Sequence, residues 1–141
     1  MRTPDFDVVT GCGPGPGSVP TGNVEPLLFE IAHALDRLLE TGETHVIDLR
    51  SIPLGPGEED RIEAALGRGE ILARLDALGP SEIRESRFPG VWLVTHRNGH
   101  DEIVARSIEI TFSPTLLDAP HEDVRAGRDR LHSELEARGD D

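Results

Sequence analysis

The sequence predicts one α+β domain, in which a mainly antiparallel sheet of four to five strands with a C-terminal hairpin is packed by two or three helices. Three observations lead to this prediction. Apolar residues recur at helical spacing over 26–41, short runs after residue 44 alternate between apolar and polar side chains, and a turn signal at 98–101 separates two strand-like runs. A chain of 141 residues is long enough to bury one core.

Three helices are expected. The first begins near Asn23 as N-cap, has Pro26 in its first turn and ends at Thr41 before Gly42. Its predicted apolar face is the set Leu28, Ile31, Leu35, Leu38 and Leu39. The second covers 58–66, with acidic residues in its first turn and Gly67 after its last.

The third helix is predicted at 121–138. Its only apolar markers are Val124, Leu131 and Leu135. Such a thin apolar stripe is typical of a helix that is loosely attached, or of one that completes its burial against a second subunit.

Strands are predicted at 44–51, 70–77, 82–87, 91–97 and 102–112. The run 70–77 alternates with period two, although a helix remains an open alternative there. The last two strands form the hairpin, because Asn-Gly-His-Asp at 98–101 favours a tight turn. Trp92, Val94 and His96 share one face of the fourth strand, and Trp92 is interpreted as a core anchor.

The ends are expected to lie outside the fold. Residues 1–25 are rich in glycine and proline, which resist helix and strand, and are predicted to be a flexible segment that carries Cys12. The domain itself is predicted to span 26–138, followed by a disordered tail at 139–141.

Composition excludes several classes of function. The net charge of −13, from 14 basic and 27 acidic residues, opposes nucleic acid and anionic membrane surfaces. All basic residues are arginine and tyrosine is absent, which excludes a Schiff-base lysine, a phosphate-loop lysine and a catalytic tyrosine. One cysteine gives no disulfide or CxxC metal site. Without a long apolar run, the chain is expected in the cytoplasm, with no cofactor.

The run 82–87 alternates acidic and basic residues beside the only tryptophan. One interpretation is exposed ion pairing on an edge strand, which contributes little stability. The other is a polar recognition edge that binds a peptide through backbone pairing. The candidate protein-interaction residues are Glu82, Arg84, Glu85, Arg87, Trp92 and His96.

Two chemical alternatives are weak. His96, His100 and Asp101 lie around a turn, yet they lack the third strong ligand of a typical zinc site. Ser81 and Ser86 have no nucleophile-elbow sequence around them. No catalytic or metal-binding residue is therefore assigned, and the chain is not expected to be an enzyme.

The run 79–98, Gly-Pro-Ser-Glu-Ile-Arg-Glu-Ser-Arg-Phe-Pro-Gly-Val-Trp-Leu-Val-Thr-His-Arg-Asn, together with 46–54 and 66–71, resembles the C-terminal conserved domain of the HupH/HyaF hydrogenase expression and formation proteins. The likeness extends from about 27 to 112, and its most specific part is Ser-Glu-Ile-Arg-Glu at 81–85 leading into Phe-Pro-Gly-Val-Trp at 88–92.

This resemblance implies an accessory role in assembling nickel-iron hydrogenases and an association with the iron–sulfur small subunit before its export, or with other maturation factors. It supplies no catalytic residues. Family members are typically about twice as long and contain two related copies of the domain, so a homodimer of this single copy would restore a two-domain arrangement.

The leading hypothesis is a non-enzymatic maturation chaperone whose acidic surface attracts the basic twin-arginine signal of the small-subunit precursor. A metal-handling protein or small enzyme in cofactor assembly, using His96 and His100, is the second hypothesis. A stand-alone dimerisation scaffold is the third.

Overall fold

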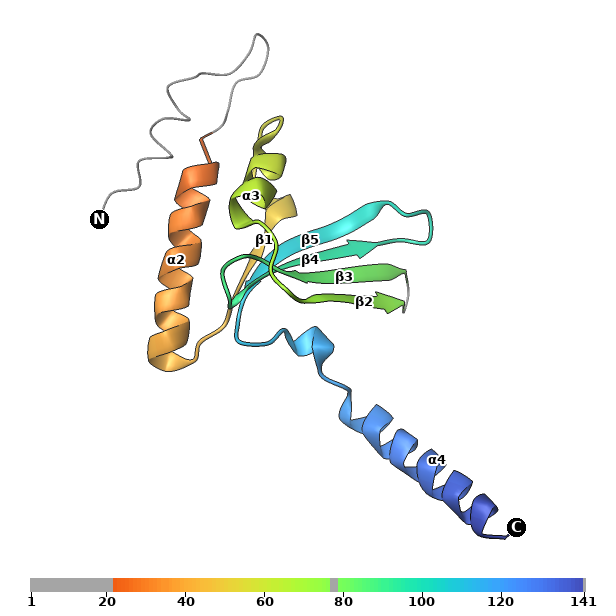
Figure 1. The fold of residues 1–141 in the computed structure, drawn as a ribbon. Helices are drawn as coiled ribbons and strands as arrows, with labels where there is room; N and C mark the ends of the chain where they lie inside the picture. The colour runs from red at the N-terminus through yellow and green to blue at the C-terminus, as the bar shows by residue number, and fades with distance from the viewer. Residues whose placement is uncertain (1–21, 77–78, 141) are drawn as a thin grey trace.

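A five-stranded antiparallel sheet with strand order β1-β5-β4-β3-β2 forms the centre of the chain, and the α+β prediction is confirmed (Figure 1). The computed structural model describes residues 22–76 and 79–140. The predicted Gly/Pro-rich segment up to residue 21, with Cys12, and the last residue lie outside the described residues. The strands are β1 His45–Asp48, β2 Leu72–Asp76, β3 Pro80–Glu85, β4 Val91–Arg97 and β5 Ile103–Ile110.

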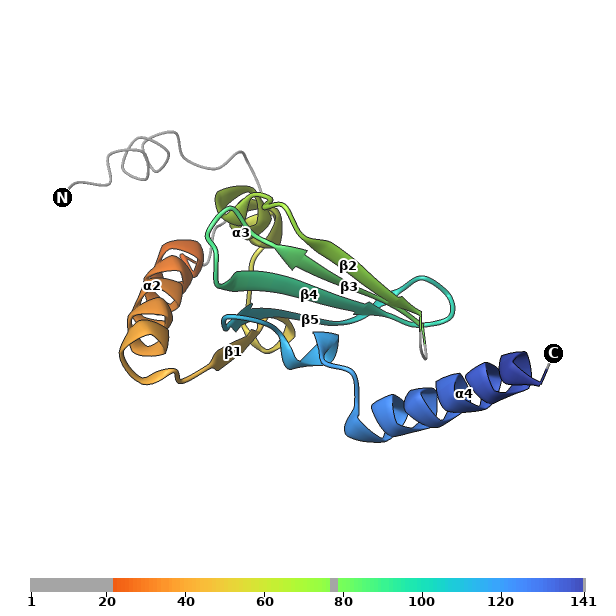
Figure 2. The same ribbon diagram turned by 60° about the horizontal axis from the view of Figure 1, so that its bottom comes forward.

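Helices α2 (Val24–Thr41) and α3 (Glu58–Leu66) lie on one face of the sheet, as Figures 1 and 2 show. Both begin and end within one residue of the predicted bounds. Gly42 adopts φ 76° after α2 and donates its N–H to the Leu38 carbonyl, which is the left-handed ending that glycine permits. The predicted apolar face was wrong at Leu39, which is 76% exposed, because the helix turns Leu27 and Ala34 toward the core instead.

The main core forms between these helices and the facing side chains of the sheet. Cross-strand register aligns Ile47, Ile108 and Leu93 in one row, and places Ile110 opposite Val91 in the next. Each of these residues is buried beneath α2 and α3. Burial of branched apolar side chains at this density is the main stabilising term for the domain.

Arg106 of β5 anchors α3 to the sheet. Its guanidinium donates to Glu59 at 2.8 Å and to Glu63 at 2.6 Å, and these carboxylates lie four residues apart on one side of the helix. The Arg106 side chain is only 12% exposed, so the pairing is better shielded than an ordinary surface ion pair.

We expect Arg106→Gln to lower the free energy of unfolding by about 1–3 kcal/mol, because two carboxylates lose their shared charged donor. Urea denaturation of both proteins measures this difference. Arg125→Gln, which removes an arginine paired to Glu122 on exposed α4, is the control and should change stability by less than about 0.5 kcal/mol. Equal effects of the two substitutions would contradict the anchoring role.

A second, smaller apolar cluster lies on the other face of the sheet. Ile83, Trp92 and Val94 are buried there, with Ala73 and Leu75 packed against them. Trp92 is 4% exposed and donates its indole N–H to the Thr111 carbonyl at 3.1 Å. The prediction that Trp92 is a core anchor is confirmed.

The chain after β5 passes through the short helix η2 (Thr115–Leu117) and continues into α4 (His121–Gly139). Pro114, just before η2, is fully buried, whereas Leu116 and Leu117 remain partly exposed. Helix α4 has no buried residue along its length and projects away from the sheet (Figure 2). Helices α2 and α3 therefore pack on the sheet, and α4 does not.

Candidate functional site

The six candidate interaction residues lie on β3, on β4 and in the turn between them, and the interpretation of 82–87 as an edge strand is wrong. Strand β3 pairs with β2 on one side and with β4 on the other. The outer strands of the sheet are β1 and β2. Since both sides of the β3 backbone are already hydrogen-bonded, an incoming peptide cannot pair with it.

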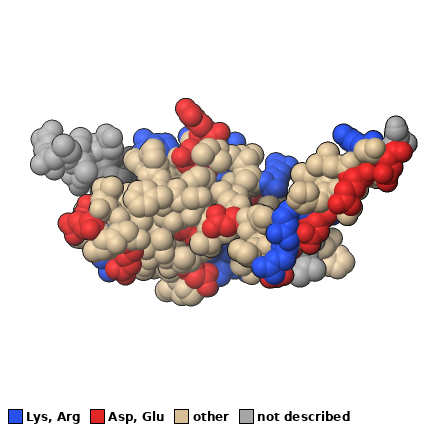
Figure 3. Space-filling view, turned by 90° about the horizontal axis from the view of Figure 1, so that it is seen from below, with Lys and Arg blue, Asp and Glu red and all other residues tan. Residues whose placement is uncertain are grey.

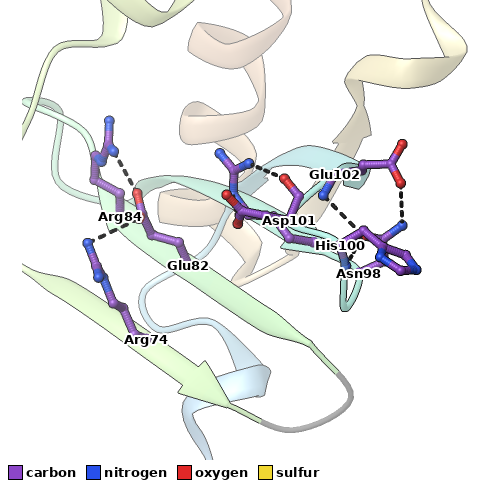
Figure 4. Close-up of polar contacts among 8 residues, drawn as sticks. Arg74, Glu82, Arg84, Asn98, His100, Asp101 and Glu102 are labelled. Carbon is purple, nitrogen blue, oxygen red and sulfur yellow. Dashed lines mark hydrogen bonds and ion pairs between the residues drawn. The ribbon is translucent and has the colours of Figure 1, made fainter.

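Glu82 and Arg84 belong to an ion-paired group on the helix-covered face of the sheet (Figure 4). Arg84 donates to Glu82 at 2.6 Å, and Arg74 of β2, directly opposite Glu82 in the register, approaches its other oxygen at 3.9 Å. Arg74 is well exposed, whereas the other two side chains are partly buried. This group, called here the Arg74–Glu82–Arg84 cluster, presents the exposed guanidinium of Arg74 on the outer strand β2.

Trp92, Glu85 and His96 lie on the opposite face, and Arg87 lies in the turn that follows β3. The Glu85 carboxylate accepts the Glu70 N–H at 2.9 Å, and Arg87 donates to the Ala65 carbonyl at 3.1 Å. The Arg87 guanidinium also lies 4.6 Å from the centre of the Phe88 ring. The structure therefore does not bring the six residues to one surface, and the buried Trp92 ring has no access to a partner.

The outer edge of β2 is the feature that the sequence interpretation missed. Glu85 donates its N–H to the Ile71 carbonyl, so the alternation of an antiparallel ladder directs the backbone groups of Leu72, Arg74 and Asp76 away from β3. Within the described part of the chain no strand pairs with this edge. Ile71 and Leu72 are 46% and 52% exposed beside it. An unpaired, partly apolar edge of this kind accepts an additional strand.

The predicted turn at 98–101 is present and uses Asn98 as its organiser. The Asn98 side-chain oxygen accepts the N–H groups of His100 at 2.8 Å and Glu102 at 3.0 Å (Figure 4). Asp101 takes a positive φ of 62° there, and Arg97 donates to its carbonyl. These contacts give the exposed His100 a structural position in the hairpin.

The two histidines of the metal hypothesis are not brought into a ligand cluster. Across 22–76 and 79–140, no three side chains among histidine, cysteine, aspartate and glutamate gather as metal ligands. His96 instead pairs with Ser81, its direct cross-strand neighbour, at 2.7 Å between Nδ1 and Oγ. The β3–β4 register places Ser81 directly opposite His96, and this position is sufficient to explain their contact.

Glu109 is a half-buried carboxylate on the same face as Trp92, its cross-strand neighbour. Burial raises the pKa of Glu109, and the charge of His96 opposes part of that rise. A carboxyl whose pKa is higher in the folded state binds its proton more tightly there. Its contribution to stability is therefore largest when it is protonated and decreases as the pH rises toward the folded pKa.

Glu109→Gln is accordingly expected to stabilise the protein at neutral pH, because it removes the cost of a buried charge. The gain should shrink as the pH falls through the range in which Glu109 takes up its proton. Urea denaturation at pH 7 and at about pH 4 measures this. A substitution that destabilises the protein at pH 7, and less so at about pH 4, would show that the charged carboxylate makes a favourable contact.

Comparison with known proteins relates this fold to one family. Residues 21–138 match the family described as HupH hydrogenase expression protein, C-terminal conserved region. The chain belongs to this family. The match includes all five strands and nearly all of the three helices, so family membership rests on the whole domain and not on a short motif.

Two curated relatives carry the same kind of description. The chain is 28% identical over 125 residues to the hydrogenase expression/formation protein HoxQ of Azotobacter vinelandii, which covers 86% of this chain and 44% of that protein. It is 28% identical over 123 residues to the hydrogenase expression/formation protein HupH of Rhizobium leguminosarum bv. viciae, with 87% and 44% covered. The HupH-family chain thus spans less than half the length of these relatives.

A solved structure supports the fold independently. The hydrogenase expression protein HupH from Thiobacillus denitrificans ATCC 25259 superposes with a TM-score of 0.80 at 42% sequence identity, covering 84% of this chain and 99% of that one. The described residues of the present HupH-family chain include no helix with both the length and the apolar character needed to cross a lipid bilayer.

Proposed function

We propose that the chain is a non-catalytic accessory protein of nickel-iron hydrogenase maturation that binds the immature iron–sulfur small subunit in the cytoplasm, before export. The observation that carries the proposal is the family match over 21–138, with relatives that are hydrogenase expression/formation proteins. The absence of lysine and tyrosine from the sequence also fits binding better than the common covalent and proton-transfer chemistries.

Charge supports a basic partner. The chain has a net charge of −13, and Figure 3 shows acidic side chains around the body and, interspersed with arginines, along projecting α4. A precursor whose export segment carries paired arginines is attracted to such a surface, which raises the association rate at low salt more than the final affinity.

The outer edge of β2 is the proposed contact, in place of β3. An extended client segment would pair with the outward backbone groups of Leu72, Arg74 and Asp76, and apolar client side chains would cover Ile71 and Leu72. The Arg74–Glu82–Arg84 cluster lies beside this edge and offers both signs of charge to the client. Glu85, whose carboxylate accepts the Glu70 N–H just before β2, is a further candidate on the other face, whereas His96 lies two strands away on β4.

Affinity isolation from hydrogenase-producing cells tests the function. The tagged chain is expected to recover the small-subunit precursor, and recovery should decrease, without disappearing, when the export segment is deleted, since that segment supplies only the electrostatic part. The processed small subunit from assembled enzyme is the control and should not be recovered. Failure to recover the precursor in either form would remove the proposal.

A further inference from the structure

Helix α4 is a 19-residue helix that contacts nothing in the fold closely enough to bury a single side chain. Its apolar residues Val124, Leu131 and Leu135 are 57%, 57% and 52% exposed. In Figures 1 and 2 it extends away from the sheet. Among residues 22–76 and 79–140, α4 therefore has no packing partner that buries its apolar side chains.

A helix of this composition is marginal by itself. Most of the stability of a helix in a protein comes from packing of its apolar face, which α4 lacks, and Gly127 in the interior costs about 1 kcal/mol relative to alanine. Only weak local pairs support it, such as Arg125 with Glu122 at 3.2 Å. Stable helical structure over 121–139 therefore requires a partner surface.

The apolar residues of α4 follow coiled-coil spacing. Val124 and Leu131 are seven residues apart and both occupy d positions, and Leu135, four residues later, occupies the following a position of the same seam. Arg128 occupies the a position between Val124 and Leu131. A seam with one central arginine accepts a second helix only where that arginine meets an apolar or acidic side chain.

The charges within α4 indicate which partner this helix binds. The whole chain carries −13, so two copies repel each other over most of their surface. Within α4, however, five acidic residues are balanced by four arginines, and the two signs are interspersed. From this near balance and the seam, we propose that α4 pairs in antiparallel orientation with α4 of a second copy of this chain.

The arginines decide the orientation. In a parallel pair each Arg128 would meet Arg128 of the partner subunit in the seam, which places like charges together. In the antiparallel pair, a positions lie opposite d positions, so Val124 packs on Leu135 of the partner subunit and Arg128 lies beside the partner's Leu131. The partner's Glu134 lies three residues, less than one helical turn, from the partner's Leu131, which places a carboxylate near Arg128.

Sedimentation equilibrium of the full chain over a wide concentration range tests the pairing, with far-UV circular dichroism as a second readout. Leu131→Glu places a charge in the seam and is expected to raise the dimer dissociation constant at least about tenfold and to reduce helix signal, with the unfolding midpoint of the body unchanged. Ser133→Glu adds the same charge on the opposite side of α4 and should leave the dimer intact.

Disulfide cross-linking tests the antiparallel orientation of the two α4 helices. In a Cys12→Ser background, Val124→Cys combined with Leu135→Cys should form a disulfide between copies on oxidation, whereas Val124→Cys alone should not. A chain that is monomeric at every concentration would overturn the proposal, including the case in which α4 folds back on its own sheet. A dimer that is insensitive to Leu131→Glu, or one in which Val124→Cys alone cross-links, would also overturn it.

Discussion

Trp92→Ala is expected to lower the free energy of unfolding by about 3–5 kcal/mol, the range for removing a large buried aromatic side chain. The ring is 4% exposed in the cluster with Ile83 and Val94, and its indole N–H satisfies the Thr111 carbonyl at 3.1 Å. Alanine would leave a cavity and an unpaired carbonyl at the point where the chain leaves the sheet.

Trp92→Phe separates the two contributions, since it keeps an aromatic ring and removes the indole N–H. We expect it to cost less than the alanine substitution, with the hydrogen bond accounting for about 1 kcal/mol of the loss. Urea denaturation followed by circular dichroism measures both variants. Near-wild-type stability of Trp92→Ala, together with lost binding to the small-subunit precursor, would mean that the ring is an interface residue after all.

Arg74→Pro is expected to weaken binding of the small-subunit precursor at least about tenfold. Proline removes one of the outward N–H groups of β2 but none of those that pair with β3, and it is tolerated on the exposed side of an edge strand. A client that adds as a strand loses a hydrogen bond and meets the proline ring at the centre of the contact.

The matched control for this prediction is Arg74→Thr, which removes the same charge and keeps the N–H on a strand-favouring residue. Threonine should reduce binding less than proline does, and chiefly at low salt. Equal losses for the two variants would assign the effect to the Arg74 charge and not to backbone pairing. Thermal unfolding of both proteins verifies that the sheet is retained.

Local signals in the sequence were sufficient for the elements themselves. The acidic first turn and Gly67 delimit α3 at Glu58–Leu66, and the apolar run after Pro89-Gly90 gives β4 its Val91–Arg97 bounds. Alternation correctly placed Trp92 and Val94 on one face. These properties depend on the secondary-structure propensities of the residues and on the spacing of apolar residues, and both are determined by residues close together in the sequence.

Strand order and burial of polar groups depend on contacts between distant residues, and there the sequence was insufficient. Nothing near 82–87 indicates that β2 extends the sheet beyond it, so an internal strand was interpreted as an edge. Glu58 was predicted only as one of the acidic residues in the first turn of α3, yet it is buried and accepts the N–H groups of Gly55 and Asn23. Acidic side chains are rarely buried, so composition favours an exposed position for it.

The candidate site was only partly predicted, because its position also depends on contacts between residues that are distant in the sequence. Residues 82 and 84 share one face of a strand, so the ion pair between Glu82 and Arg84 follows from their spacing. The predicted recognition edge also needed an exposed Trp92 beside them, whereas Trp92 is buried on the opposite face. The neighbouring outer edge at Leu72 and Arg74 lies ten residues earlier in the chain. Only the β2–β3 register brings it beside Glu82.

Titration of the purified chain with purified hydrogenase small-subunit precursor tests the central proposal most directly, with the large-subunit precursor of the same enzyme as the comparison. We expect saturable binding to the small subunit, weaker at high salt because the acidic chain attracts a basic segment. No saturable binding should occur with the large subunit. Binding only to the large subunit, or to neither, would contradict the proposed function.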